Sequence, residues 1–239
     1  SKIKSKSGSG KSDEGWMLSG DHIISKFNAS DATKIGVVLK ADVNNNFENG
    51  YIESPSIIWD SNLSKYVMVY TAYSSNHTAS IGWAISDDLI SWKKKGQLKA
   101  ASGDTSKGDG FGLTGPCLLY YRNKYYLFAI GLNSAGYEGE PINMVLFTTD
   151  SLTAPNWEHK GIVIPIQSSI PWCNEAIYHP HPCFLNGKWY MFFNARGSVN
   201  GYSAERCGFA TADSLDGLWT VDPNRISEFA ESQSGQMFI

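Results

Sequence analysis

The 239-residue sequence has little charge, no surplus of basic residues and no long apolar run. Lys and Arg total 20 against 23 Asp and Glu, a net charge of −3, so the basic surplus that usually marks nucleic-acid binding is absent. No apolar run approaches the roughly 18 residues of a membrane-spanning helix, and we expect no membrane span. Residues 1–12 hold one apolar residue, Ile3. They lack the apolar region of a signal peptide and are predicted to form a flexible basic tail.

Cysteine is also scarce. The four cysteines form no CxxC pair, which argues against a zinc knuckle: Cys117, Cys173, Cys183 and Cys207. Cys117 and Cys183 each follow a proline, in GPCLLY and HPCFLN. This match predicts small buried residues at one equivalent place in two repeated units.

Aromatic and turn-forming residues are abundant, and they recur in three repeated units. Aromatics make up 13% of the chain, which also has 23 Gly and 9 Pro. The first proline of each unit lies 61 and 66 residues after the one before: Pro55, Pro116 and Pro182. A tryptophan closes each unit 37, 41 and 37 residues after that proline: Trp92, Trp157 and Trp219. We interpret these tryptophans as packing between units.

Each unit has the same local pattern. A short apolar segment after the proline leads through a polar turn to a strongly aromatic segment, YVMVYTAY, YYLFAI or WYMFFNA, and then to a third apolar segment. Such segments are typical of strands bounded by turns, and no sustained helical period occurs. We therefore predict an all-β fold, a β-propeller of four-stranded antiparallel blades. A single domain over 13–239 would hold clear blade repeats at 51–95, 112–160 and 178–221.

The repeat pattern resembles the five-bladed propellers of glycoside hydrolases such as family 43 and its relatives, over about residues 50–221. It combines P-x-hydrophobic, G-K-x-Y-x-x-F/Y and hydrophobic-G-x-A-x-S/T-x-D-x-L-x-x-W. Five blades of roughly 60 residues would need about 300 residues. We expect either four blades, the last formed by 13–50 and 222–239, or part of a longer polypeptide. The apolar end SQSGQMFI, which reads as an interrupted strand, favours the second.

The resemblance implies three carboxylates at one end of the central channel: two Asp, each directly before a proline, and a Glu acid two residues before one. Glu53-Ser54-Pro55 has the acid's spacing. The matching places in the other units are taken as Thr114-Gly115-Pro116 and Pro180-His181-Pro182, which carry no carboxylate. One carboxyl must protonate the leaving oxygen while another activates water or attacks the sugar. Asp109 and Glu175 are the candidates for the partner of Glu53.

Sugar recognition needs aromatic platforms and polar side chains. Trp172 is a candidate platform, and His179, His181, Arg196 and Arg206 are candidates for binding the substrate. Each has a structural alternative: the histidines can bond to neighbours, and either arginine can pair with Glu175 or Glu205. The loops 74–80, 131–141 and 196–205 occupy one place in each unit and are predicted to rim one face.

Metal sites have little support in the sequence. A second interpretation of Glu175, His179 and His181 is that they are the ligands of a metal ion. Such histidines more often form a hydrogen bond to a neighbour or to a ligand hydroxyl. We predict no catalytic metal and no cofactor. Calcium in a structural role is left open at the acidic turns 86–88 and 44–46, where no EF-hand spacing occurs.

The sequence supports two main functional hypotheses. The first is a carbohydrate-active propeller that hydrolyses glycosidic bonds of an oligo- or polysaccharide by carboxylate acid/base chemistry. The second is a non-catalytic glycan-binding module for host or receptor recognition within a larger assembly such as a phage tail. A protein-interaction platform is the third and weakest. We rank the hydrolase first and favour an extracellular or surface location, while the sugar, the stereochemical outcome and the oligomeric state are left undetermined.

Overall fold

The computed structural model describes residues 35–136, 138–154, 156–197 and 205–226, together with the backbone of residues 3–4 and 17–18. The chain divides into two compact units, residues 1–37 and 38–239. In the first unit, β1 (Ile3–Lys4) pairs antiparallel with β2 (Met17–Leu18). Apart from Ile3 and Lys4, the predicted tail over 1–12 lies outside the described residues. Within the described part, no helix is long and apolar enough to cross a membrane.

The first blade is an antiparallel sheet of four strands, which follow one another in chain order. They are β3 (Tyr51–Asp60), β4 (Lys65–Tyr73), β5 (Ala79–Ser86) and β6 (Trp92–Lys99). The middle strands are buried over nearly their whole length, whereas β6 alternates between exposed and half-buried residues. A strand covered on both faces reads as continuously apolar, and an outer strand needs only one apolar face.

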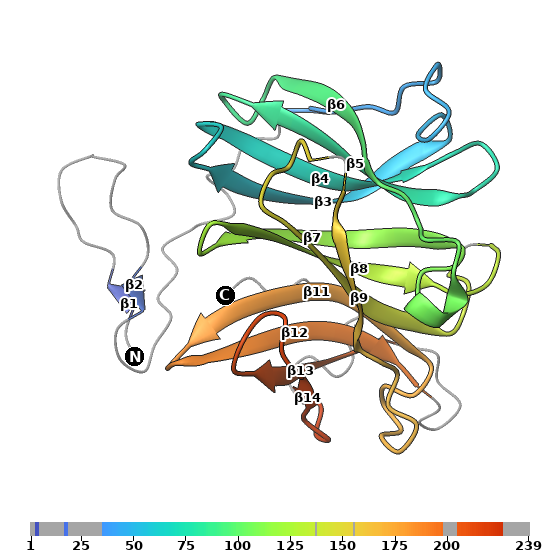
Figure 1. Ribbon diagram of the computed structural model, residues 1–239, viewed down its shortest axis with the longest axis vertical. Helices are drawn as coiled ribbons and strands as arrows, with labels where there is room; N and C mark the ends of the chain where they lie inside the picture. The colour runs from blue at the N-terminus through green and yellow to red at the C-terminus, as the bar shows by residue number, and fades with distance from the viewer. Residues whose placement is uncertain are drawn as a thin grey trace. The chain divides into compact units, whose positions relative to one another are not determined.

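The next eight strands form one larger sheet, which consists of two four-stranded blades joined by a single parallel pairing of Ala176 with Ile142 (Figure 1). The second blade of the protein consists of β7 (Gly112–Tyr121), β8 (Lys124–Leu132), β9 (Ile142–Thr149) and β10 (Glu158–Ile164). The third consists of β11 (Ala176–Leu185), β12 (Lys188–Arg196), β13 (Arg206–Ala212) and β14 (Thr220–Val221). A short 3-10 turn, η2 (Thr105–Lys107), lies between the first two blades. The predicted all-β architecture of four-stranded antiparallel blades is confirmed.

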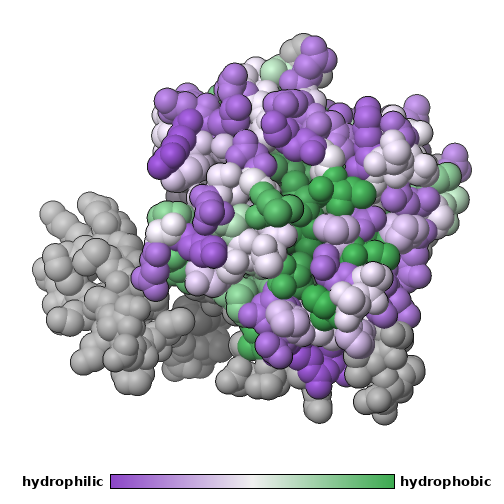
Figure 2. Space-filling model, turned by 60° about the horizontal axis from the view of Figure 1, so that its bottom comes forward, coloured by the Kyte–Doolittle hydropathy of each residue, from purple (hydrophilic) through white to green (hydrophobic). Residues whose placement is uncertain are grey.

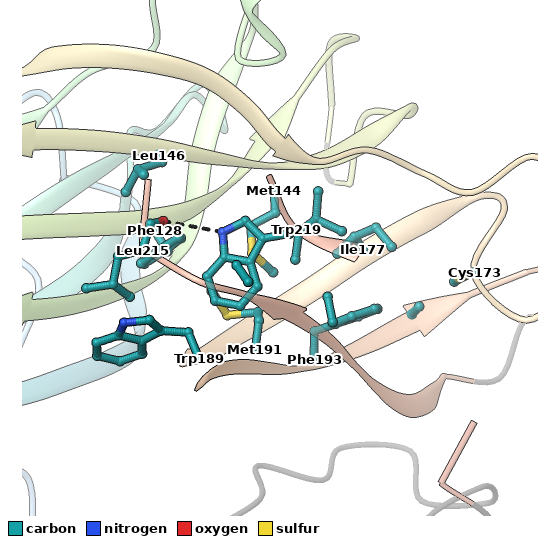
Figure 3. Packing of buried hydrophobic residues seen from close by; sticks show 14 of the residues in the cluster. Phe128, Met144, Leu146, Cys173, Ile177, Trp189, Met191, Phe193, Leu215 and Trp219 are labelled. Atoms are coloured by element: carbon teal, nitrogen blue, oxygen red, sulfur yellow. Dashed lines mark hydrogen bonds between the residues drawn. The ribbon is translucent and has the colours of Figure 1, made fainter. Parts of the chain in front are cut away.

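Apolar side chains fill the spaces between consecutive blades. One buried cluster joins the first blade to the second through residues such as Val69 and Leu127. Another joins the second to the third through residues such as Phe128 and Met191 (Figure 3). Trp157 lies in the first of these clusters and Trp219 in the second, which confirms the predicted packing between units for these two.

The segment before β3 covers part of the first blade. Leu39 and Phe47 pack against a cluster on that blade, as does Trp92. The fully buried Glu48 accepts a hydrogen bond from the hydroxyl of Tyr70 at 3.0 Å and forms an ion pair with Lys94 at 2.8 Å. Residues 35–50 and 222–226 contain no strand, and the rest of the segments considered for a fourth blade lies outside the described residues.

The three inner strands in the described residues carry the same irregularity. The register shifts between Glu53 and Ser56 in β3, between Thr114 and Cys117 in β7, and between Tyr178 and His181 in β11. Each shift is a bulge, in which two residues oppose one on the neighbouring strand. The first bulged residue has a left-handed backbone: φ is 49° at Ser54, 52° at Gly115 and 51° at His179. The second is a proline, which suits a bulge because it has no N–H to donate.

This register corrects the alignment of the third unit. Its equivalent proline is Pro180 rather than Pro182, because Pro180 follows the left-handed residue and lies in the bulge. The equivalent of Cys117 is therefore His181, so the predicted equivalence of Cys117 and Cys183 was wrong. The sequence HPHP offers two prolines in the same spacing, and only the strand pairing distinguishes them.

Polar contacts also join the first two blades. The buried carboxylate of Asp60 accepts a hydrogen bond from the hydroxyl of Tyr125 at 2.6 Å. Burial, with Asp60 as acceptor, raises the pKa of Tyr125 to about 12, so the hydroxyl remains a donor. At the bulge, the backbone N–H of Gly115 donates to Oγ1 of Thr71 at 2.9 Å. The inner strand of the second blade is thus tied to the first blade at its bulge.

The bulge at Gly115 provides a test of this packing. A Cβ at Gly115 would lie 2.5 Å from Cδ1 of Ile130, whereas a Cβ at Gly187 (φ 82°) would meet no atom within 4 Å. Backbone strain and overpacking together should make Gly115→Ala cost about 2–4 kcal/mol of unfolding free energy. Gly187→Ala should cost only the strain, about 1 kcal/mol. Equal costs in urea denaturation would contradict close packing at the bulge.

Candidate functional site

The three inner strands enclose a cavity of about 370 Å³. Its lining comes from the bulges and the residues that follow them, in segments 54–57, 115–119 and 179–182. It therefore lies along the central channel that a propeller places between its inner strands. Figure 2 shows one face of the molecule, where hydrophobic residues gather in the centre and hydrophilic residues surround them.

One residue of each inner strand directly precedes the left-handed position of the bulge. These equivalent residues are Glu53, Thr114 and Tyr178. Oγ1 of Thr114 lies 3.2 Å from Oγ1 of Thr71, in a hydrogen bond between blades. The three places before the bulges thus carry one carboxylate, one alcohol and one phenol, and they adjoin the residues that line the cavity.

Glu53 is only partly buried, on β3. It borders a second cavity of about 190 Å³, together with Leu39, Met68 and Tyr70, and it is not among the residues that line the channel cavity. No hydrogen bond or ion pair joins its side chain to any residue that the structure describes. The other two carboxylates considered from the sequence, Asp109 and Glu175, do have partners among these residues.

The histidines of β11 both line the channel. His179 is the left-handed residue of the bulge, and His181 follows Pro180. Burial lowers the pKa of His181, so its imidazole is neutral at neutral pH. A neutral imidazole offers one donor and one acceptor, which suits a hydroxyl partner.

Asp109 lies elsewhere and is fully buried. Its carboxylate accepts hydrogen bonds from the N–H of Ser102 at 3.0 Å and from the Ser102 hydroxyl at 2.5 Å. It also contacts Nε2 of His159 at 2.9 Å. Nδ1 of His159 accepts the N–H of Gly161, so Nε2 carries the proton and donates to Asp109. These bonds tie the connection between two blades to the outer strand β10.

Trp172 is buried, with 5% of its surface exposed. Its ring stacks on Phe193 with centroids 5.6 Å apart, and a Cβ at Gly208 would touch it at 2.1 Å. Its indole N–H donates to the carbonyl of Pro223. Trp172 therefore lies in the core, and it is not among the residues that line the channel cavity.

Arg196 and Glu175 lie together where the third blade meets the loop after β8. Arg196 forms ion pairs with Glu138 at 3.1 Å, with Glu140, and with Glu175 at 3.9 Å. Arg206 instead donates to the carbonyl of Glu205 at 3.0 Å. The structure therefore brings Glu175 and Arg196 together and groups His179 with His181, but it separates Asp109 and Trp172 from the channel.

Glu138, Glu140 and Tyr178 were not identified as site residues from the sequence. The hydroxyl of Tyr178 donates to Oε2 of Glu138 at 3.2 Å. A signal was present, because Glu138 and Glu140 lie in the 131–141 loop that was predicted to rim one face. Their ion pairs with Arg196 show that this loop meets the start of the 196–205 loop, of which residues 198–204 lie outside the described part.

Metal binding has no further support in the described residues. None of their His, Cys, Asp and Glu side chains forms a group of three or more that could hold an ion. In the turn at 86–88, Oδ1 of Asp88 accepts the N–H groups of Ile90 and Ser91 and the hydroxyl of Ser86. These hydrogen bonds lower the pKa of Asp88 to about 2. Calcium at this turn stays a prediction.

Comparison with known proteins supports the fold assignment. No family model matches the sequence. Among curated proteins, "Xylosidase/arabinosidase 43A" of Humicola insolens is 28% identical over 120 residues, 46% of this chain and 35% of the relative. Among solved structures, Zg3597, a family 117 glycoside hydrolase of Zobellia galactanivorans, has a TM-score of 0.61 and 26% identity. It matches 75% of this chain and 57% of its own.

The α-L-arabinofuranosidase PaAbf62A of Podospora anserina, solved in complex with cellotriose, shares the fold at 14% identity. Its TM-score is 0.53, over 79% of this chain and 54% of that one. The chain resembles β-propeller glycoside hydrolases. It spans about a third of the length of the curated relative and just over half of each of these two structures.

The buried Asp109 in this glycosidase-like propeller can be tested by Asp109→Asn. The amide cannot accept all three bonds, and its NH₂ would oppose a donor from Ser102 or His159, so unfolding free energy should fall by about 2–3 kcal/mol. Asp104→Asn is the control. Asp104 accepts the N–H of Ser106 in an exposed hydrogen bond at the start of a short turn, and Asn can accept the same bond, so its unfolding free energy should change little. Urea denaturation measures both. An unchanged midpoint for Asp109→Asn would contradict its role in joining the blades.

Proposed function

We propose that the protein is carbohydrate-active, binds a saccharide at the mouth of the channel and hydrolyses a glycosidic bond, with Glu53 as the proton donor. The observation that carries the proposal is the position of Glu53. It directly precedes a bulge that lines the channel, and its carboxylate has no partner among the described residues. The likeness to propeller glycoside hydrolases supports this choice of chemistry.

Hydrolysis also needs a second carboxylate, to activate water or attack the sugar. Of the two partners considered from the sequence, Asp109 is fully buried with its oxygens occupied. The side chain of Glu175 is 41% exposed and contacts Arg196 only at 3.9 Å. Glu175 is therefore the better candidate to turn toward a bound substrate.

The remaining channel groups fit a saccharide. His179 and His181 line the cavity and offer donors and acceptors for sugar hydroxyls. Pro55, Pro116 and Pro180 add apolar surface beside them, which suits the C–H faces of a sugar ring. Because Trp172 is buried in the core, we do not assign it to binding.

Glu53→Gln tests the proton donor, because an amide cannot supply the proton. General acid catalysis contributes about 10²–10⁴-fold, so cleavage of an alkyl glycoside or oligosaccharide should fall by about this factor. A dinitrophenyl glycoside has a leaving group that needs little protonation, and its cleavage should fall far less. Xylosides and arabinofuranosides are the first substrates to measure, because the curated relative is named a xylosidase/arabinosidase.

The matched control is Glu158→Gln, on outer strand β10, where Glu158 pairs with Lys160. This variant should keep wild-type rates with every leaving group. Equal losses for Glu53→Gln with good and poor leaving groups would exclude Glu53 as the proton donor. Full activity of Glu53→Gln would remove it from the mechanism altogether.

Non-catalytic glycan binding is the alternative function. One observation favours it: only one of the three equivalent places before the bulges carries a carboxylate, since the others are Thr114 and Tyr178. In that case a glycan array should show specific binding while no bound glycan is cleaved. Turnover of a bound glycan would rule out this alternative.

A further inference from the structure

Arg196 lies at the end of β12, and its side chain is 19% exposed. Nη1 donates to Oε2 of Glu138 at 3.1 Å, Nη2 bonds to Glu140, and Nε lies 3.9 Å from Oε2 of Glu175. Arginine binds an anionic ligand by presenting a free edge with two N–H groups. Here each of the three nitrogens already faces a carboxylate, so the contacts favour a role for Arg196 within the protein.

Tyr178 and Arg196 both donate hydrogen bonds to the carboxylate of Glu138. Only 4% of its surface is exposed, and its hydroxyl donates to Oε2 of Glu138 at 3.2 Å. The guanidinium carbon of Arg196 lies 5.7 Å from the centre of the Tyr178 ring, within range of a cation–π contact. Burial and the negative charge of Glu138 raise the pKa of Tyr178, so its hydroxyl keeps the proton that it donates.

Glu138 is held in an unfavourable backbone conformation, with φ at 52°. A left-handed backbone is uncommon for a residue other than glycine and persists where surrounding contacts hold it. The two donors on Oε2 come from the third blade, whereas Glu138 belongs to the loop after β8 in the second. Nearby, the only backbone pairing between the described parts of these blades is Ala176 with Ile142.

The contact of Tyr178 with Glu138 is one residue away from the channel lining, because Tyr178 directly precedes His179. His179 is the left-handed residue of the bulge and lines the cavity. We propose that Arg196 and Tyr178 are positioning residues, which clamp Glu138 against the inner strand of the third blade and thereby fix the channel wall at His179 for a saccharide. The proposal rests on the proposed function for the identity of the ligand.

Tyr178→Phe is the sharpest variant, because it removes one oxygen and leaves the ring. Tyr190→Phe is the matched control, since Tyr190 lies among Phe192 and Phe209 on the same blade. Loss of a hydrogen bond to a charged group should raise KM, or the Kd for a saccharide, about tenfold. The Tyr178 hydroxyl bonds to Glu138 and to neither proposed catalytic carboxylate, Glu53 or Glu175, so kcat should stay within about twofold, the pattern of lost binding rather than lost chemistry.

Glu138→Gln should resemble Tyr178→Phe, because it removes the charge of the carboxylate that accepts the Tyr178 hydroxyl. Both variants weaken the same charge-assisted hydrogen bond, so their effects in the double variant should be less than additive. Arg196→Lys should also raise KM, because one ammonium group cannot replace a planar guanidinium that faces three carboxylates. Additive effects of Tyr178→Phe and Glu138→Gln would overturn the proposal. So would a fall in kcat with unchanged KM.

Amide hydrogen exchange tests the clamp without any substrate. Tyr178→Phe and Glu138→Gln should each speed exchange both in the loop at 133–140 and in the strand at 176–182, while Tyr190→Phe should leave both at wild-type rates. If Tyr178→Phe matches Tyr190→Phe in both segments, the clamp does not exist. If exchange responds as expected but the wild-type protein neither binds nor cleaves any saccharide, the clamp stands and the proposed function fails.

Discussion

The structure depends on one constraint that recurs in each inner strand: a left-handed residue followed by proline in a bulge. Proline has no N–H for the strand pairing, and the left-handed residue before it lets two residues oppose one on the neighbouring strand. The bulges at Ser54, Gly115 and His179 line one cavity and set which side chains precede it. Glu53, Thr114 and Tyr178 therefore occupy equivalent places, although they share no chemistry.

The carboxylates of the described residues differ in whether they are bonded within the protein. Asp60, Asp109 and Glu48 are buried, and each is bonded to a distant part of the chain. Removing such a buried acceptor leaves unpaired donors, which costs far more than losing an exposed ion pair. Glu53 has no partner among the described residues, and this difference in surroundings, rather than residue type, makes it the candidate acid.

The contact of Arg196 with Glu138 joins two blades beside their one strand pairing in the described residues, Ala176 with Ile142. The second and third blades otherwise meet largely through apolar side chains, which hold them together without fixing a single polar geometry. A guanidinium and a phenol on one carboxylate oxygen do fix such a geometry. They also place the loop after β8 beside the strand that carries His179. The position of the loop after β8 therefore depends on residues of both the second and the third blade.

The sequence by itself determined the repeat, the strand pattern and the blade type, because strands covered on both faces must be apolar along their length and their turns must be polar. It also pointed to Glu53 and to the loop that holds Glu138. Only the tertiary structure decided that Pro180 rather than Pro182 lies in the third bulge, that Asp109 and Trp172 are buried, and that Arg196 faces three carboxylates. Strand pattern is a local property of each segment. Register, burial and charge pairing depend on residues far apart in the chain, and spacing alone does not specify which of them meet.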